Sequence, residues 1–116
     1  MIKTNFLMED NYITMVRGDT LSFGVEIEKQ DGTPLDIDSA FFTCKKSYTG
    51  EAFEFQKSMN SGISKESAGK YIVRVAPEDT ASMESGKYFY DFQISSDSDV
   101  FTIMRGTLEI EQDFTN

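Results

Sequence analysis

The sequence contains no histidine and no tryptophan, and it has one cysteine and two prolines among 116 residues. Without histidine the chain lacks the commonest general base, the usual nitrogen ligand of zinc, and every Ser-His or Cys-His nucleophile pair. Because Cys44 is alone, no disulfide can form within the chain. These absences exclude most enzyme classes, and we expect a non-enzymatic protein that uses neither a cofactor nor a metal ion.

Basic residues are also few, with 11 Lys and Arg against 20 Asp and Glu, which gives a formal net charge of −9. Nucleic acids and anionic membrane surfaces would be repelled by most faces of such a chain, so neither is an expected partner. No apolar run approaches the roughly 20 residues that cross a bilayer. The N-terminal residues lack the apolar core of a secretory signal, and we expect synthesis in a reducing cytoplasm.

Apolar residues recur with a period of two, which is typical of half-buried strands. Leu21, Phe23, Val25 and Ile27 alternate with polar or small residues. The same alternation returns at Phe53 and Phe55, Tyr71 to Val75, Tyr88 to Ile94, Phe101 and Ile103, and Leu108 and Ile110, with shorter strands expected at 13–15 and 40–44. The pattern predicts about seven strands whose alternating apolar side chains face inward.

Turn-forming residues separate these segments at 31–34, 49–50, 60–62, 85–86 and 96–99. Pro77 and the acids after it predict one short helical turn over residues 77–83. No linker divides the chain, so residues 1–116 are expected to form a single all-β domain, an antiparallel β-sandwich. Residues 1–11 could form a mobile or partner-bound arm.

The segment Gly86-Lys87-Tyr88-Phe89-Tyr90 resembles the tyrosine corner of immunoglobulin-like sandwiches. There the tyrosine ring enters the core and its hydroxyl returns to the preceding corner. Tyr90 stands where antibody domains have their second cysteine, so an aromatic ring must fill that space. We assign Gly86, Tyr88 and Tyr90 a structural role and expect an immunoglobulin-like sandwich.

Three further motifs have a functional and a plain structural interpretation. Arg17-Gly18-Asp19 matches an integrin ligand, but it runs directly into a strand and fits a tight bend better. Asp36-Ile37-Asp38 and Asp97-Ser98-Asp99 offer oxygen ligands for calcium, yet solvated aspartates at turns explain both pairs more simply. Cys44 lies in an apolar strand and is expected to be an inert core thiol.

Four blocks of the chain each combine a turn with a strand. They are Val16-Arg17-Gly18-Asp19-Thr20 with Phe23; Asp31-Gly32-Thr33-Pro34-Leu35-Asp36; Gly69-Lys70-Tyr71-Ile72-Val73 with Ala76-Pro77-Glu78-Asp79-Thr80-Ala81; and Gly86-Lys87-Tyr88-Phe89-Tyr90-Asp91-Phe92-Gln93-Ile94 with Thr102, Gly106 and Leu108. In these blocks the chain is similar to the N-terminal domain of the upper baseplate proteins of siphophages that infect Gram-positive bacteria.

The resemblance implies an immunoglobulin-like sandwich built into a bacteriophage or prophage tail or baseplate, made in the host bacterial cytoplasm. It also implies other tail proteins, and further copies of this chain, as partners. Members of that family often continue into a helical or receptor-binding part, so a free-standing subunit and part of a longer protein both fit.

Three functions follow from these observations. The first is a virion structural module that acts through protein contacts. The second is a carbohydrate-binding or host-adhesion module, in which aromatic residues that break the inward alternation form a sugar platform; these are Tyr12, Phe41, Tyr48 and Phe89. The third is a small carboxylate enzyme such as a glycosidase, although nothing singles out one of the 20 acids as catalytic.

Overall fold

Nine strands and one helix of four residues make up the part of the chain that the computed structural model describes, which is residues 2–4, 11–47, 49–50 and 52–113. The elements are β1 (Ile2–Thr4), β2 (Tyr12–Val16), β3 (Leu21–Ile27), β4 (Ser39–Lys45), β5 (Phe55–Met59), β6 (Gly62–Ser67), β7 (Lys70–Val75), α1 (Pro77–Thr80), β8 (Gly86–Ser96) and β9 (Asp99–Glu111). The predicted all-β class is therefore confirmed.

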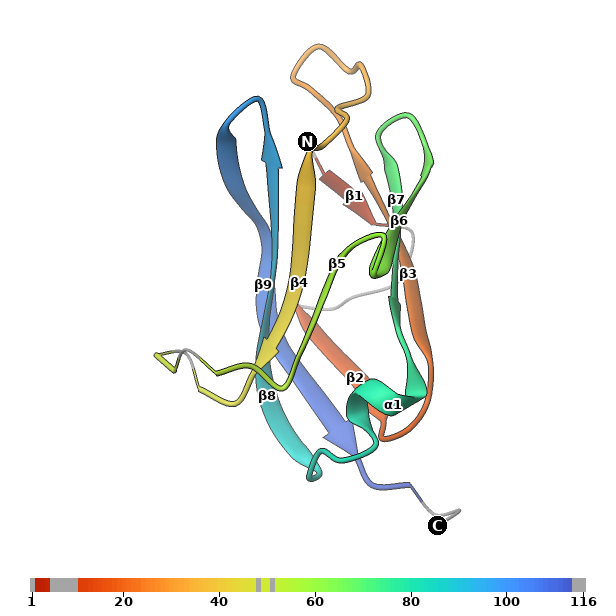
Figure 1. Ribbon diagram of the computed structural model, residues 1–116, viewed down its shortest axis with the longest axis vertical. Coiled ribbons are helices and arrows are strands. Elements are labelled where there is room, and N and C mark those ends of the chain that lie inside the picture. Colours follow the sequence, from red (N-terminus) through yellow and green to blue (C-terminus); the bar gives the residue numbers. More distant parts are fainter. Residues whose placement is uncertain (1, 5–10, 48, 51, 114–116) are drawn as a thin grey trace.

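All nine strands belong to one mixed sheet in the order β1-β3-β7-β6-β5-β4-β8-β9-β2. Strands β2 and β3 follow each other in the chain but lie near opposite ends of this order, so the sheet curls round until it is nearly closed like a barrel. Figure 1 shows β4, β8 and β9 on one side and β3, β6 and β7 on the other, with β5 crossing between them. The side chains on the concave face form the core.

The strand count and pairing differ from the sequence prediction of about seven antiparallel strands. Strand β2 pairs with β9 in parallel, and so does β5 with β6, the latter through only two residue pairs. Strand β6 was not predicted because Ile63 is its one buried residue, so its sequence shows no alternation. Strand β1 has three residues, too few for a periodic pattern.

Part of residues 1–11, the segment expected as an arm, forms β1. Ile2 and Thr4 pair in antiparallel register with Ile27 and Val25, so β1 extends the sheet beside β3. Residues 1 and 5–10 of that prediction lie outside the described residues. Asn11 precedes β2, and its carbonyl accepts a hydrogen bond of 3.0 Å from the Thr107 N–H.

The core confirms most of the predicted inward-facing residues and corrects two of them. Phe53 is 50% exposed, because β5 begins only at Phe55. Phe101 is 47% exposed although it pairs with the buried Ile94, because it lies close to the turn between β8 and β9. The buried apolar side chains of the central strands are Phe23, Val25 and Ile27 of β3, Ala40, Phe42 and Cys44 of β4, Tyr71, Val73 and Val75 of β7, Tyr88, Tyr90, Phe92 and Ile94 of β8, and Met104, Leu108 and Ile110 of β9.

The helical turn forms where proline predicts it but ends at Thr80, three residues earlier than expected. Asp79 starts it by accepting the Ala76 N–H at 2.7 Å, and the same carboxylate pairs with Lys57 of β5 at 2.8 Å. Thr80 is fully buried and accepts the N–H of Gly18 at 2.8 Å. The turn thus ties the end of β7 both to β5 and to the β2–β3 bend.

Candidate functional site

The outward face of strands β5, β4 and β8 has exposed aromatic side chains next to polar ones. Along β4, Ala40, Phe42 and Cys44 face the core, so Phe41 and Lys45 point away from it. The register places Phe41 opposite Gln93 of β8. Phe41 is 39% exposed although both neighbouring strands are paired.

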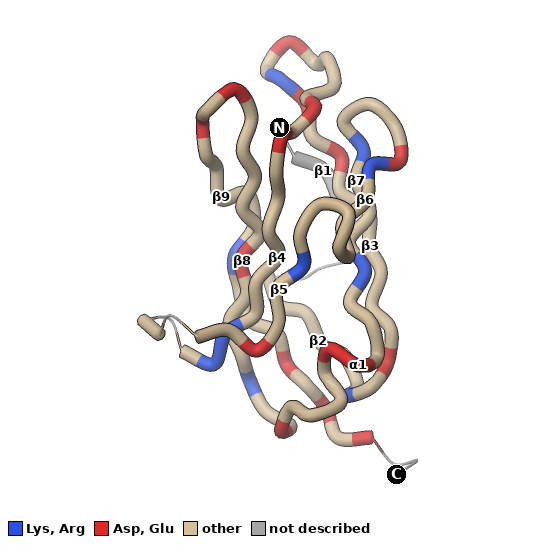
Figure 2. Tube along the Cα trace, in the orientation of Figure 1, with Lys and Arg blue, Asp and Glu red and all other residues tan. Residues whose placement is uncertain are grey.

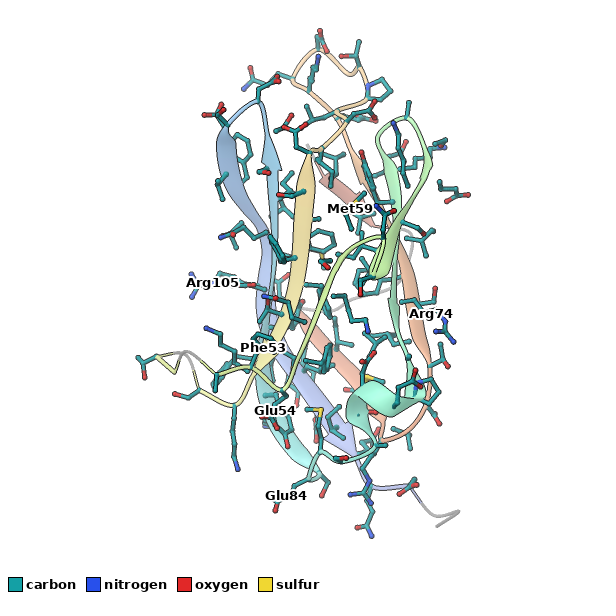
Figure 3. All side chains as sticks on the ribbon, viewed as in Figure 1. Phe53, Glu54, Met59, Arg74, Glu84 and Arg105 are labelled. Atoms are coloured by element: carbon teal, nitrogen blue, oxygen red, sulfur yellow. The ribbon has the colours of Figure 1, made fainter. Side chains whose placement is uncertain are left out.

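An open groove of about 450 Å³ runs over this face. We call it the aromatic groove; its lining residues are Phe41, Thr43, Lys45, Phe53, Gln56, Asp91 and Gln93. A second hollow of about 210 Å³ adjoins it toward β9, lined by Thr43, Lys45, Ser47, Phe89, Tyr90, Asp91, Thr102 and Arg105. Figure 3 labels Phe53 and Arg105 on this side of the molecule and Arg74 on the opposite side.

Hydrogen bonds order the polar part of the aromatic groove. Gln56 of β5 donates to the Thr43 hydroxyl at 3.0 Å, and Lys45 donates to the Gly50 carbonyl at 2.9 Å. Two cations, Lys45 and Arg105, and one anion, Asp91, line the groove and its adjoining hollow. The lining of the groove and hollow thus has one more basic residue than acidic, in a chain whose net charge is −9. The surface is shallow and suits a broad contact better than an enclosed small molecule.

The predicted aromatic platform is only partly brought together. Phe41 lines the aromatic groove and Phe89 lines the adjoining hollow. Tyr12 lies on the same side but two strands away from Phe89, since both residues pair with Thr107 of β9. Tyr48 lies outside the described residues. The sequence does not identify Phe53 as an exposed aromatic residue, because its spacing from Phe55 matches the alternation of a strand.

Tyr12 is engaged within the sheet. Its hydroxyl donates to the Glu109 carboxylate, and the Lys87 ammonium lies 5.9 Å from the centre of its ring. The hydrogen bond to Glu109 raises the pKa of Tyr12. The ring thus helps to hold β2 against β9 and β8, and it takes no part in the aromatic groove.

The tyrosine corner has the geometry expected from the sequence. The Tyr88 ring is buried, and its hydroxyl donates to the Glu84 carbonyl at 2.7 Å. Gly86 begins β8 with φ of 145°, in the region that favours glycine. The Tyr90 ring is buried with its centre 5.5 Å from that of Phe42. These residues fasten the start of β8 beneath the aromatic groove.

Cys44 is fully buried, and burial raises the pKa of its thiol to about 12, with the Glu54 carboxylate adding to the shift. A thiol that stays protonated in the core is a poor nucleophile. The prediction of an inert core thiol fits this environment.

Burial likewise raises the pKa of Tyr90 to about 12, so both groups predict a loss of stability in alkali. In the unfolded chain they ionise near pH 9 and 10, whereas the folded chain keeps them neutral to about pH 12. Their stabilisation is complete below pH 9 and is lost as the pH rises toward 12. Urea midpoints measured from pH 7 to 12 should fall above pH 9, and in Cys44→Ala the fall should begin about one pH unit later. Equal midpoints throughout would contradict this.

The Arg17-Gly18-Asp19 motif forms the bend between β2 and β3. Arg17 pairs with Asp113 at 3.0 Å and donates to the Met83 carbonyl at 3.2 Å. Gly18 has φ of 82°. Because the arginine is bound by its own chain, the motif is part of the fold and does not present an extended integrin ligand.

The two aspartate pairs come close together at one end of the molecule. Asp38 accepts the N–H of Asp97 at 2.9 Å. Asp36 accepts the N–H of Gly69 at 3.0 Å and pairs with Lys65 at 3.0 Å, and these contacts lower the pKa of Asp36. Within the described ranges, no three acidic, cysteine or histidine side chains gather as a possible metal site. The pairs therefore connect loops.

A scan against protein-family models finds no match to this chain, and a search of curated proteins finds none either. In the part of the chain that the structure describes, no helix has the length and apolar character to pass through a membrane.

Proposed function

We propose that this chain is a structural module of a bacteriophage or prophage tail or baseplate, and that it acts through protein contacts made by the aromatic groove. The main support for a protein contact at the aromatic groove is that Phe41 and Phe53 are exposed beside hydrogen-bonded polar groups on one open face of the sheet. Apolar anchors surrounded by polar groups are the usual composition of protein interfaces. The four sequence blocks support the placement in a virion.

The proposal includes an immunoglobulin-like sandwich as the finer description of the fold. One observation supports this description: β5 and β6 pair in parallel through only two residue pairs. This short pairing separates the strands β1, β3, β7 and β6 from the strands β5, β4, β8, β9 and β2. The rings of Phe23 in β3 and Phe42 in β4 meet across the core with centres 5.5 Å apart. The Tyr88 contact with Glu84 adds a feature of that fold.

The test is to purify phage particles from a bacterium that encodes this chain and to look for the chain in them by mass spectrometry. We expect it in a fixed ratio to the other tail proteins. A Phe41→Ser, Phe53→Ser variant supplied in place of the native chain should be depleted from particles, whereas Arg74→Glu, on the opposite side, should be incorporated normally. Infectious particles that contain none of the native chain would refute the proposal.

A second candidate, a carbohydrate-binding module for host adhesion, is favoured by one observation. Phe41 and Phe53 line the same groove as Gln56, Asp91 and Gln93, and aromatic faces beside amide and carboxylate groups are suited to sugars. Binding on a glycan array that is lost in Phe41→Ala and kept in Tyr12→Ala would support it. An array without signal for the native chain would exclude the sugars displayed.

A further inference from the structure

Four large hydrophobic side chains are exposed among the described residues, and they fall into two pairs. Phe41 and Phe53 lie in the aromatic groove, whereas Val100 and Phe101, 61% and 47% exposed, lie where β8 turns into β9. We call residues 97–101 the hairpin tip. Val100 pairs with Ser95 and Phe101 with Ile94, so the turn has an apolar side chain on each face. A turn of this kind can enter an open groove whose lining is also partly apolar.

The hairpin tip and the aromatic groove also differ in the charged residues that they contain. The hairpin tip contains Asp97 and Asp99 and no basic residue, and Asp38 is hydrogen-bonded to it. The aromatic groove and its adjoining hollow contain Lys45 and Arg105 against a single acid. Figure 2 shows acidic residues at the β8–β9 turn and basic residues near the far end of β4. The hairpin tip has acidic residues alone, whereas basic residues outnumber acidic ones in the lining of the groove and hollow.

The hairpin tip is also held in a fixed conformation. Asp97 and Ser98 have φ of 51° and 71°, as in the two-residue turns that match the twist of paired strands. Ser96 and Asp99 on either side of the turn are paired in register. The Asp97 N–H is bound by Asp38 of the neighbouring loop at 2.9 Å. A preorganised tip loses little conformational entropy when it binds.

We propose that the occupant of the aromatic groove is the hairpin tip of a second copy of this chain. Val100 and Phe101 of one copy pack against Phe41 and Phe53 of the next, and the tip carboxylates face Lys45 and Arg105. The inference rests on the proposed function and deepens it by naming the partner. Because the two surfaces differ, the contact is head-to-tail, and repeated addition of copies gives a closed ring or a helical filament.

Charge also favours this arrangement over groove-to-groove or tip-to-tip contacts. Two copies with a net charge of −9 repel each other, so association requires that regions of opposite charge meet. A tip-to-tip contact would bring together the four carboxylates of Asp97 and Asp99 from two copies, and a groove-to-groove contact would bring together the cations of Lys45 and Arg105. Only the contact between tip and groove brings unlike charges together.

The experiment uses two double variants of surface residues. Phe41→Ser, Phe53→Ser disables the groove and leaves the tip intact, whereas Val100→Ser, Phe101→Ser disables the tip and leaves the groove intact. In sedimentation velocity the native chain should form a species larger than a dimer. Each variant alone should be a monomer, and their mixture should give a one-to-one dimer, because one intact tip and one intact groove remain. Circular dichroism confirms that both variants are folded.

Charge reversal tests the electrostatic part of the same contact. Arg105→Glu or Asp99→Lys should each weaken association at least tenfold, and a mixture of the two variants should recover part of the loss. Arg74→Glu, a matched reversal on the opposite side, should leave association unchanged. Self-association by the tip variant alone, or no dimer in the mixture, would overturn the head-to-tail contact.

A native chain that stays monomeric at every concentration would also overturn this inference. The particle experiment separates that failure from failure of the proposed function. A monomeric chain that is still incorporated into tails would need a different protein in its aromatic groove. An oligomeric chain that is absent from particles would keep the tip-to-groove contact and refute the role in a virion.

Discussion

Replacing Phe42 with alanine is expected to lower the free energy of unfolding by about 4 kcal/mol, the range found when a fully buried aromatic side chain is truncated. Phe42 has no exposed surface, and its ring centre lies 5.5 Å from that of Phe23, 6.3 Å from Phe55 and 6.1 Å from Phe92. The ring joins both sides of the curled sheet. Its loss leaves a cavity that paired strands on either side of β4 cannot close.

Urea unfolding followed by tyrosine fluorescence measures this loss. Phe42→Leu is the matched control, because it keeps most of the volume and should cost less than half as much. A domain of this kind has about 5–15 kcal/mol of stability in total, so Phe42→Ala should also expose its core and bind a hydrophobic dye near the unfolding midpoint. A loss below about 1 kcal/mol would mean that Phe42 is not central to the core.

Gly106→Ala is expected to cost about 3 kcal/mol, an upper value for inserting one carbon where no space exists. A Cβ on residue 106 would lie 1.9 Å from the carbonyl oxygen of Asn11 and 2.7 Å from the Asn11 Cβ. The obstacle is backbone, so no side chain can rotate away. Asn11 must therefore move, and the hydrogen bond from the Thr107 N–H to the Asn11 carbonyl is then lost.

Gly50→Ala is the control for Gly106→Ala, since its Cβ would meet the nearest atom, the Ser47 Cβ, at an ordinary 3.8 Å. Urea unfolding should show a large loss for residue 106 and almost none for residue 50. Hydrogen exchange should locate the damage, with faster exchange at the Thr107 amide than at the centre of β4. Equal stability of the two variants would contradict the close approach of Asn11 to β9.

The sequence predicts the central strands because their burial repeats every second residue. The large side chains of Phe23, Val25 and Ile27 in β3 follow this rule, as do the buried residues of β8 from Tyr88 to Ile94. Strand β6 escapes the rule because its side chains are mostly exposed, and its position depends on pairing with β7. The parallel pairing of β2 with β9 joins residues almost a whole chain apart, and no local pattern reports it.

The candidate site could be predicted only in part for a related reason. Phe41 and Phe89 break the inward alternation of their own strands, which is a local signal, and both lie on the groove face. Phe53 and Phe101 follow that alternation in the sequence, but Phe53 lies outside β5 and Phe101 lies close to the β8–β9 turn, so both are exposed. Lys45 and Arg105 line the same hollow because β4, β8 and β9 are neighbours in the sheet. That strand order cannot be read from local sequence patterns.

The pairing of β2 with residues Thr107–Glu111 has a consequence for how the protein is made. A ribosome releases β2 well before β9, its strand partner in the described sheet, because β9 follows much later in the chain. Until β9 has been made, β2 has no strand to pair with, and the growing chain cannot complete its sheet. Folding is therefore completed only after synthesis of β9, and a nascent chain stalled before Thr107 should remain accessible to proteases and chaperones.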